Sequence, residues 1–224
     1  MADINDVKDA LFLFVRHGTT LLNEEEKFRG WSDDDSAALD KKGVFQARQA
    51  GRFLKTLPLK YGIIISSDLD RSLHTAAVIG TILGISDIHF DARLRPLNVG
   101  RYAGLDKEKH SIQKYLDNPD TVIPGGESLN QFKGRWKDFT SDLDDWAKEN
   151  PGITPILVDH LSGVVYWEDL ANESNAYEGY FHNYAEDKED LIRPGGVIAV
   201  MPGIKVVPLL GENKKSDISD KGGE

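Results

Sequence analysis

The stretch LFLFVRHG, residues 11–18, places the tightest constraint on how this chain folds. Its five apolar residues, 11–15, form a run of strand length, which is typical of a strand buried on both faces of a parallel sheet. Arg16 and His17 follow this run directly. In α/β proteins, ligands bind beyond the carboxyl ends of such strands, so the two polar residues stand where a ligand site is expected.

The rest of the hydrophobic pattern alternates strands with helices. Further strands are expected at 62–67, 87–90, 155–159, 196–200 and 204–209. Helices are expected at 40–57, 68–84, 128–149 and 163–171. This alternation predicts an α/β fold, a three-layer sandwich whose mostly parallel central sheet is flanked by helices on both faces. No linker interrupts the pattern, so residues 1–210 are expected to form a single domain, followed by a flexible tail at 211–224 that is poor in apolar residues.

Composition narrows the class of protein and its compartment. The chain of 224 residues contains no cysteine, which excludes disulfides, thiolate nucleophiles and cysteine metal sites. A formal charge of −10 disfavours broad nucleic-acid binding, because the Lys and Arg residues are scattered. The apolar run near the N-terminus is too short for a signal peptide or a membrane span, so a cytoplasmic protein is expected. His89, His110 and His182 are isolated, and no metal site or cofactor is predicted.

Polar residues follow three of the expected strands at the points where those strands end. They are Arg16-His17, Ser66-Ser67-Asp68 with Arg71, and Asp159-His160. Because the carboxyl ends of parallel strands meet at one edge of a sheet, we expect these residues to converge. Guanidinium groups present a fork of donors that suits phosphate, and an imidazole nitrogen can attack phosphorus. A second imidazole can donate to the charge that develops in the reaction. The pattern thus predicts phosphoryl transfer in which arginines take the place of a metal ion.

Three segments resemble the motifs of a known family. VRHGTT (15–20) with Asn23, SSDLDRSLHTA (66–76) and VDHLSGVV (158–165) are similar, in order and spacing, to those of the histidine phosphatase superfamily, which includes the cofactor-dependent phosphoglycerate mutases. The resemblance implies an α/β sandwich, no required metal and a phosphohistidine on His17. It also implies that a phosphate pocket is completed by Arg16, Arg71 and His160. Substrate contacts are further implied for Asn23, Gly18 and Thr19, and for Arg29 and Gly30 in FRGW, a segment that resembles one closing over the substrate.

Two positions depart from the family's pattern. Most members carry a glutamate general acid two residues after an Arg-Leu pair, whereas RLRPLNVGRYAGL (93–105) has Pro96 there, and proline has no proton to donate. Glu127, in a Gly-Gly-Glu-Ser turn that resembles a segment bordering the family's active site, is the preferred replacement. Asp159, next to His160, is the second candidate. Leu161 follows the histidine where many members have glycine, which alters one backbone donor to the phosphate.

Three functions stay open at this point. The leading hypothesis is a metal-independent phosphomonoester hydrolase that forms and then hydrolyses a phosphohistidine on His17. A phosphoglycerate mutase is ranked second, because the stretch between Arg101 and Pro124 has no basic insertion to hold a second phosphate. Pro96 motivates a third hypothesis, a catalytically weak module that binds a phosphorylated partner. The residues that select the phosphorylated molecule are expected in 91–126 and around 172–190, and the sequence specifies neither that molecule nor an oligomeric state.

Overall fold

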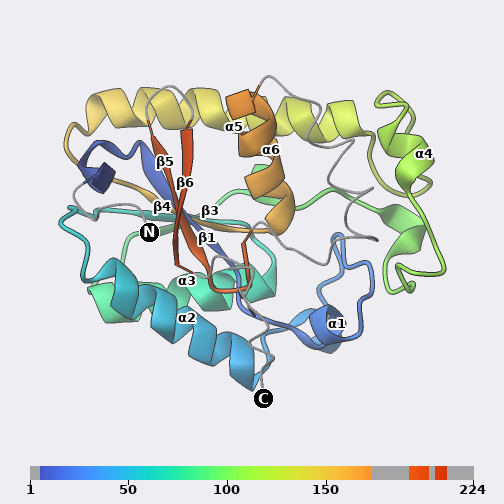
Figure 1. Ribbon diagram of the computed structural model, residues 1–224, viewed down its shortest axis with the longest axis horizontal. Coiled ribbons are helices and arrows are strands. Elements are labelled where there is room, and N and C mark those ends of the chain that lie inside the picture. Colours follow the sequence, from blue (N-terminus) through green and yellow to red (C-terminus); the bar gives the residue numbers. More distant parts are fainter. Residues whose placement is uncertain (1–5, 173–191, 202–204, 211–224) are drawn as a thin grey trace, which may run out of the picture.

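The computed structural model describes residues 6–172, 192–201 and 205–210, which are arranged around one six-stranded sheet (Figure 1). The strands are β1 (Phe12–Arg16), β2 (Ile64–Ser66), β3 (Ile88–Phe90), β4 (Ile156–Asp159), β5 (Val197–Met201) and β6 (Lys205–Leu210). Their order in the sheet is β3-β2-β4-β1-β5-β6. The first four strands in this order pair in parallel, whereas β5 is antiparallel to both of its neighbours. The sheet is therefore mixed and mostly parallel, which confirms the predicted class.

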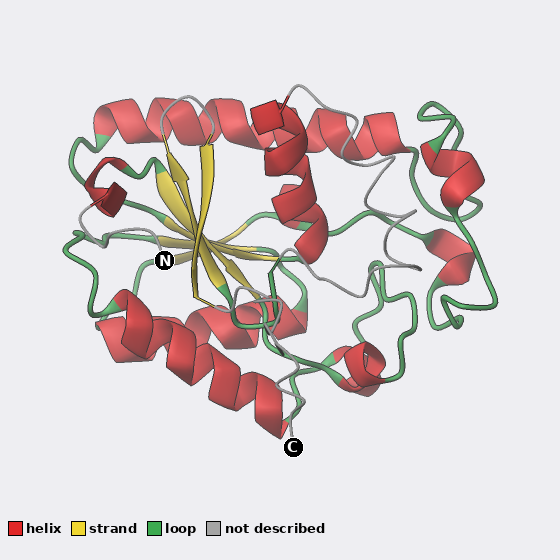
Figure 2. Cartoon of the chain, in the orientation of Figure 1, coloured by secondary structure: helices red, strands yellow, loops and turns green. Residues whose placement is uncertain are grey.

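Helices cover both faces of this sheet. The α-helices of the described residues are α1 (Leu21–Glu24), α2 (Lys41–Leu54), α3 (Asp70–Leu83), α4 (Gln113–Leu116), α5 (Leu129–Glu149) and α6 (Leu161–Asn172). Short 3₁₀ helices are η1 (Asp6–Asp9), η2 (Asp35–Ala37), η3 (Ala92–Leu94) and η4 (Gly100–Tyr102). Helices α2 and α3 lie on one face, and α5 and α6 lie on the other (Figure 2). Across these described ranges, no helix has both the length and the apolar character that a membrane span requires.

Successive side chains of the strands enter two separate hydrophobic layers. Phe12 and Phe14 of β1 pack in the layer that includes α5 and α6, whereas Leu13 and Val15 pack in the layer that includes α2 and α3. Alternate residues of a strand point to opposite faces, so a strand with two covered faces needs apolar residues at every position. This is the physical reason for the continuous apolar run that precedes Arg16, and all five residues of β1 are buried.

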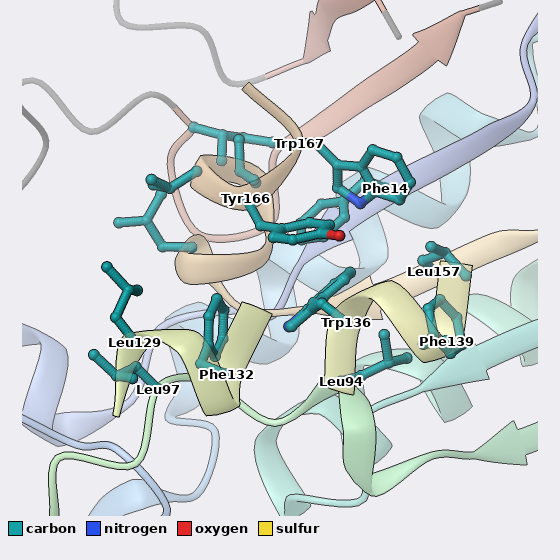
Figure 3. Packing of buried hydrophobic residues seen from close by; sticks show 14 of the residues in the cluster. Phe14, Leu94, Leu97, Leu129, Phe132, Trp136, Phe139, Leu157, Tyr166 and Trp167 are labelled. Atoms are coloured by element: carbon teal, nitrogen blue, oxygen red, sulfur yellow. The ribbon is translucent and has the colours of Figure 1, made fainter. Parts of the chain in front are cut away.

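Helix α5 anchors one of the two layers through an aromatic stripe. Phe132, Trp136 and Phe139 recur at helical spacing and are buried against the sheet. Figure 3 shows Trp136 among these rings and those of Tyr166 and Trp167 from α6, whose centroids lie 5.3 Å and 6.5 Å from the Trp136 ring. These ring contacts pack α5 against α6 on the face of the sheet that carries Phe12 and Phe14.

The observed elements differ from the expected ones mainly at their ends. Helix α6 begins at Leu161, directly after His160 and two residues before its expected start. Helix α3 ends at Leu83, and Gly84 follows in the left-handed conformation that stops a helix. The stretch 91–126, for which no helix was predicted, contains η3, η4 and α4. The predicted flexible tail at 211–224 lies outside the described residues.

Candidate active site

The carboxyl ends of β1, β2 and β4 meet, as parallel pairing requires. The backbone N–H of His17 donates to the carbonyl oxygen of Asp159 at 2.8 Å, which joins the end of β1 to the end of β4. On the other side of β4, the N–H of Ser67 donates to the carbonyl oxygen of Val158 at 3.1 Å. The rings of His17 and His160 consequently lie edge to face, with centroids 5.0 Å apart.

His17 has one ring nitrogen engaged by the backbone. Its Nδ1 lies 2.7 Å from the carbonyl oxygen of Gly18, and because a carbonyl only accepts, Nδ1 carries the proton. Nε2 is then the unprotonated nitrogen, with the lone pair that a nucleophile needs. Burial lowers the pKa of His17 well below its ordinary value, and the charges of Arg29, Arg71 and Arg16 lower it further. The imidazole is therefore neutral at neutral pH.

Two residues that the resemblance assigned to substrate contact fasten the turn after β1 onto α2. Gly18 crosses α2 so closely that a Cβ on it would lie 2.3 Å from the carbonyl oxygen of Gly43. The hydroxyl of Thr19 donates to the Asp40 carboxylate at 2.9 Å, and the same carboxylate caps α2 by accepting from the N–H of Gly43 at 2.6 Å. These contacts position His17, and direct contact of either residue with a substrate stays a prediction.

Arg71, in the first turn of α3, is buried beside the segment predicted to close over a substrate. Its Nη1 and Nη2 donate to the carbonyl oxygens of Ser32 and Gly30 at 2.8 Å and 2.9 Å. Its Nε–H has no hydrogen-bond partner among the residues that the structure describes. Burial lowers the pKa of Arg71 to about 10, against the opposing charges of Asp33 and Asp159. The guanidinium group therefore stays charged at neutral pH and retains one buried donor for a ligand.

Asn23 and Arg29 approach the same site from the segment that follows β1. The Oδ1 atom of Asn23 accepts hydrogen bonds from the N–H and the hydroxyl of Thr20 at 3.1 Å and 3.0 Å, and a further one from Nη1 of Arg29. The Arg29 charge lowers the pKa of both His17 and His160. Arg29 thus lies near the two histidines and is held by Asn23, and contact of either residue with a substrate stays a prediction.

Arg16 completes the cationic surroundings of the His17 ring. It is only 2% exposed, and its Nη1 donates to the carbonyl oxygen of Ile192 at 2.6 Å. Three guanidinium groups, those of Arg16, Arg29 and Arg71, act electrostatically on one buried imidazole. A chain with a net charge of −10 thus concentrates positive charge here, and such an arrangement favours an anionic ligand.

Comparison with known proteins identifies the family to which this site belongs. The profile of the histidine phosphatase superfamily, branch 1, matches residues 12–162, a range that includes His17, Arg71 and His160. The chain belongs to the histidine phosphatase superfamily. Members of this superfamily are phosphatases or mutases that act on small phosphorylated substrates, and this chain is an enzyme of that group by sequence and fold.

The relatives of this superfamily enzyme differ in their named activities. The probable phosphoglycerate mutase GpmB of Salmonella choleraesuis is 37% identical over 153 residues, covering 65% of this chain and 67% of the relative. The crystal structure of phosphoglycerate mutase from Thermus thermophilus has a TM-score of 0.61 and 27% identity, covering 88% of this chain and 97% of that one. A mycobacterial glucosyl-3-phosphoglycerate phosphatase shares the fold, with a TM-score of 0.67 and 22% identity over 90% of this chain and 98% of its own.

The second histidine of this superfamily enzyme lies beside two serine hydroxyls. Nε2 of His160 is 3.0 Å from Oγ of Ser67 and 3.4 Å from Oγ of Ser72. Burial lowers the pKa of His160 well below its ordinary value, and the charges of Arg71 and His17 act in the same direction. His160 is therefore neutral at neutral pH when no anion is bound.

Pro96, which the resemblance places at the position of the family's usual acid, lies in a segment held by hydrogen bonds to its backbone. Arg135 of α5 donates to the carbonyl oxygens of Arg95 and Pro96 at 2.6 Å and 2.9 Å. The indole N–H of Trp31 donates to the same Pro96 carbonyl at 2.8 Å. The segment next to FRGW is thus fixed in place without a carboxyl group at this position.

Glu127, the preferred replacement for the missing acid, forms a two-pronged ion pair with Arg135. Its Oε1 is 2.7 Å from Nη2 and its Oε2 is 3.1 Å from Nε of Arg135, and Oε1 also accepts from the N–H of Asn98 at 2.8 Å. A carboxylate in such a pair is an acceptor and carries no proton to donate. The role of Glu127 as general acid stays a prediction, which these contacts disfavour.

Sequence reasoning missed Arg135 and Ser72. Arg135 lies on α5 between the core residues Phe132 and Trp136, and no motif distinguishes it from other arginines on exposed faces. Ser72 directly follows Arg71, and this adjacency in the first turn of α3 was the available signal. Among the described residues, no group of three or more His, Asp or Glu side chains is placed to hold a metal ion.

Proposed function

We propose that this enzyme hydrolyses phosphomonoesters through a phosphohistidine on His17. The observation that carries the proposal is the hydrogen bond from Nδ1 of His17 to the carbonyl oxygen of Gly18, which leaves Nε2 as the nucleophile. The lowered pKa of His17 keeps this nitrogen unprotonated at neutral pH, so no separate base is needed to activate it.

Three arginines support the same chemistry. As Nε2 attacks, negative charge is spread over the oxygens of the transferring phosphoryl group, and guanidinium groups already in place stabilise this charge. The buried Nε–H of Arg71, which lacks a partner among the described residues, is satisfied when a phosphate oxygen accepts from it. The P–O bond of the ester breaks as the P–N bond forms, and the alcohol leaves. Water then attacks the phosphorus, the P–N bond breaks, and inorganic phosphate leaves.

Release of phosphate from p-nitrophenyl phosphate in the presence of EDTA tests the proposal. His17→Ala is expected to abolish the activity and to prevent formation of an acid-labile, base-stable phosphoenzyme. His74→Ala is the matched control, because His74 lies exposed on α3 and is expected to leave the rate unchanged. Phosphate release that persists in His17→Ala contradicts the nucleophile assignment, and a wild-type enzyme that binds orthovanadate without turnover contradicts hydrolysis.

Phosphoglycerate mutase activity is the second candidate, because the relatives from Salmonella choleraesuis and Thermus thermophilus carry that name. A mutase must keep the phosphohistidine away from water until the phosphoryl group returns to the substrate. A coupled assay with 3-phosphoglycerate and catalytic 2,3-bisphosphoglycerate separates the two candidates, since only a mutase forms 2-phosphoglycerate. Binding of a phosphorylated ligand with neither activity favours the phosphate-binding module that Pro96 suggested.

A further inference from the structure

The side chain of Asp159 is the most unusual polar group in the described part of the chain. It is 0% exposed, and no side chain among the described residues donates a hydrogen bond to either carboxyl oxygen. A buried polar group without a partner costs stability, and the cost is larger when the group is charged. The residue therefore needs an explanation other than support of the fold.

The surroundings of this carboxyl group are apolar on one side and polar on the other. A Cβ on Gly163 of α6 would lie 2.5 Å from Oδ2 of Asp159 and 2.7 Å from Cζ2 of Trp136, so the carboxyl group and the indole edge both border the space that this glycine leaves open. On the other side, Oδ1 of Asp159 lies 3.6 Å from Nε2 of His160. The carboxyl group thus faces only one titratable ring at short range among the residues that the structure describes.

None of the nearby guanidinium groups in the described residues donates a hydrogen bond to this carboxyl group. Arg71 donates to the backbone of the 30–32 segment, and Arg135 is paired with Glu127. Arg16 lies opposite Asp159 in the β1–β4 pair, and its Nη1 donates to the carbonyl oxygen of Ile192. Burial raises the pKa of Asp159 well above its ordinary value, although the backbone N–H of His160 and the charges of Arg135 and Arg71 oppose this shift. Burial therefore favours the protonated form of the carboxyl group in the free enzyme.

We propose that Asp159 stores the proton that the leaving group receives, and that it acts through His160. Asp159 does not contact the substrate itself; its effect on the reaction passes through His160. This inference rests on the function proposed above. Asp159 lies at the end of β4, directly before His160, and supplies the proton from there. The position at which the family usually carries its acid is occupied by Pro96.

The proton passes along the ring of His160 while the ester bond breaks. Nε2 of His17 forms a bond to phosphorus, and the bond from phosphorus to the leaving oxygen breaks. His160 gives the proton of its Nδ1 to that oxygen and takes the proton of the Asp159 carboxyl group on Nε2, which exchanges its 3.0 Å contact with the Ser67 hydroxyl for the Oδ1 atom of Asp159, 3.6 Å away at rest. His160 stays neutral, Asp159 becomes a carboxylate, and the alcohol leaves.

The second half of the reaction restores the starting state. Water attacks phosphorus, its proton goes to Nδ1 of His160, and the proton on Nε2 returns to Asp159. The P–N bond breaks and hydrogen phosphate leaves. One water molecule and the ester are consumed, and no other reactant is required.

The dependence of the rate on the leaving group tests this role. p-Nitrophenolate leaves with little protonation, whereas an alkoxide needs a proton. Asp159→Asn keeps the shape of the side chain but cannot supply the proton, so it is expected to change kcat for p-nitrophenyl phosphate by less than about threefold and to lower kcat for β-glycerol phosphate by about 100-fold or more, the range for acid catalysis. Glu127→Gln is the matched control, and we expect it to change both rates by the same factor. Equal losses for both esters in Asp159→Asn, or an unequal loss in Glu127→Gln, overturn the proposal.

Infrared difference spectroscopy gives a second readout that does not depend on turnover. When orthovanadate binds, the band of a protonated carboxyl group is expected to disappear in the wild type, and this change is expected to be absent in Asp159→Asn. A band that persists with vanadate bound overturns the role of Asp159 even in an active enzyme. An enzyme without hydrolysis that still shows the band change contradicts the proposed function and leaves the proton-storing role of Asp159 supported.

Discussion

Replacing Arg135 with methionine tests whether its pair with Glu127 holds the Pro96 segment. The side chains of Arg135 and Glu127 are 15% and 12% exposed, so the variant leaves a carboxylate with little access to water. The carbonyl oxygens of Arg95 and Pro96 also lose their Arg135 donors. Removing one partner of a buried ion pair costs roughly 3–5 kcal/mol. Because some solvent reaches this pair, we expect a loss of about 3 kcal/mol in the free energy of unfolding, at the lower end of that range.

Urea-induced unfolding at pH 7, followed by tryptophan fluorescence and analysed by linear extrapolation, measures this loss. Arg93→Met is the matched control, because Arg93 pairs with Asp91 and with Asp142, whose side chain is 68% exposed. The side chains of Arg93 and Asp91 are 33% and 21% exposed, so both pairs of Arg93 are more exposed than the Arg135–Glu127 pair. The control is therefore expected to lose clearly less stability, about 1 kcal/mol.

Combining Arg135→Met with Glu127→Gln in a double-mutant cycle measures the interaction energy between the two side chains. The two losses are expected to be non-additive by about 1–3 kcal/mol, as for residues in direct contact. A loss below about 1 kcal/mol in Arg135→Met, or additive effects in the double variant, refutes the structural role of the pair. In that case Glu127 returns as the leading candidate for the general acid.

Three further predictions follow from the backbone and from the buried imidazole. Gly18→Ala places a Cβ 2.3 Å from the carbonyl oxygen of Gly43, so we expect a loss of roughly 1–3 kcal/mol or more in thermal or urea unfolding, and unchanged stability contradicts the close crossing. In Gly84→Ala the added Cβ has no atom within 4 Å, so we expect only the cost of the φ of +73°, a loss of about 1–2 kcal/mol in the free energy of unfolding. A larger loss contradicts the open space around Gly84. The pKa of His17 is lowered in the folded protein. Below about pH 6.5 the unfolded chain therefore binds a proton at this residue, whereas the native state does not. His17 thus lowers the free energy of unfolding as the pH falls through that value. His17→Gln is expected to flatten this dependence in thermal melts between about pH 5 and pH 7.5, and an unchanged slope is evidence against a neutral His17.

The sequence by itself determined the sheet and the position of the site within it. The apolar run of β1 predicted a strand covered on both faces, because a strand with one wet face alternates polar and apolar residues. Since parallel strands end at a common edge, the polar residues after β1, β2 and β4 were expected to meet, and the 5.0 Å separation of the His17 and His160 rings follows from that rule. The glycine stop at Gly84 was likewise a local property of the chain.

Only the tertiary structure decided which polar groups became partners. From the sequence, Glu127 was the preferred acid, but the packing of α5 brings Arg135 onto it. Asp159 was the second candidate, and its burial beside Gly163 and Trp136 leaves the carboxyl group without a side-chain hydrogen bond among the described residues. The spacing of apolar residues along the chain predicts which face of a helix or strand is buried, because that face depends on the sequence alone. Ion pairing and protonation depend instead on the distances between segments remote in sequence and on the water excluded between them, and these are properties of the packed molecule.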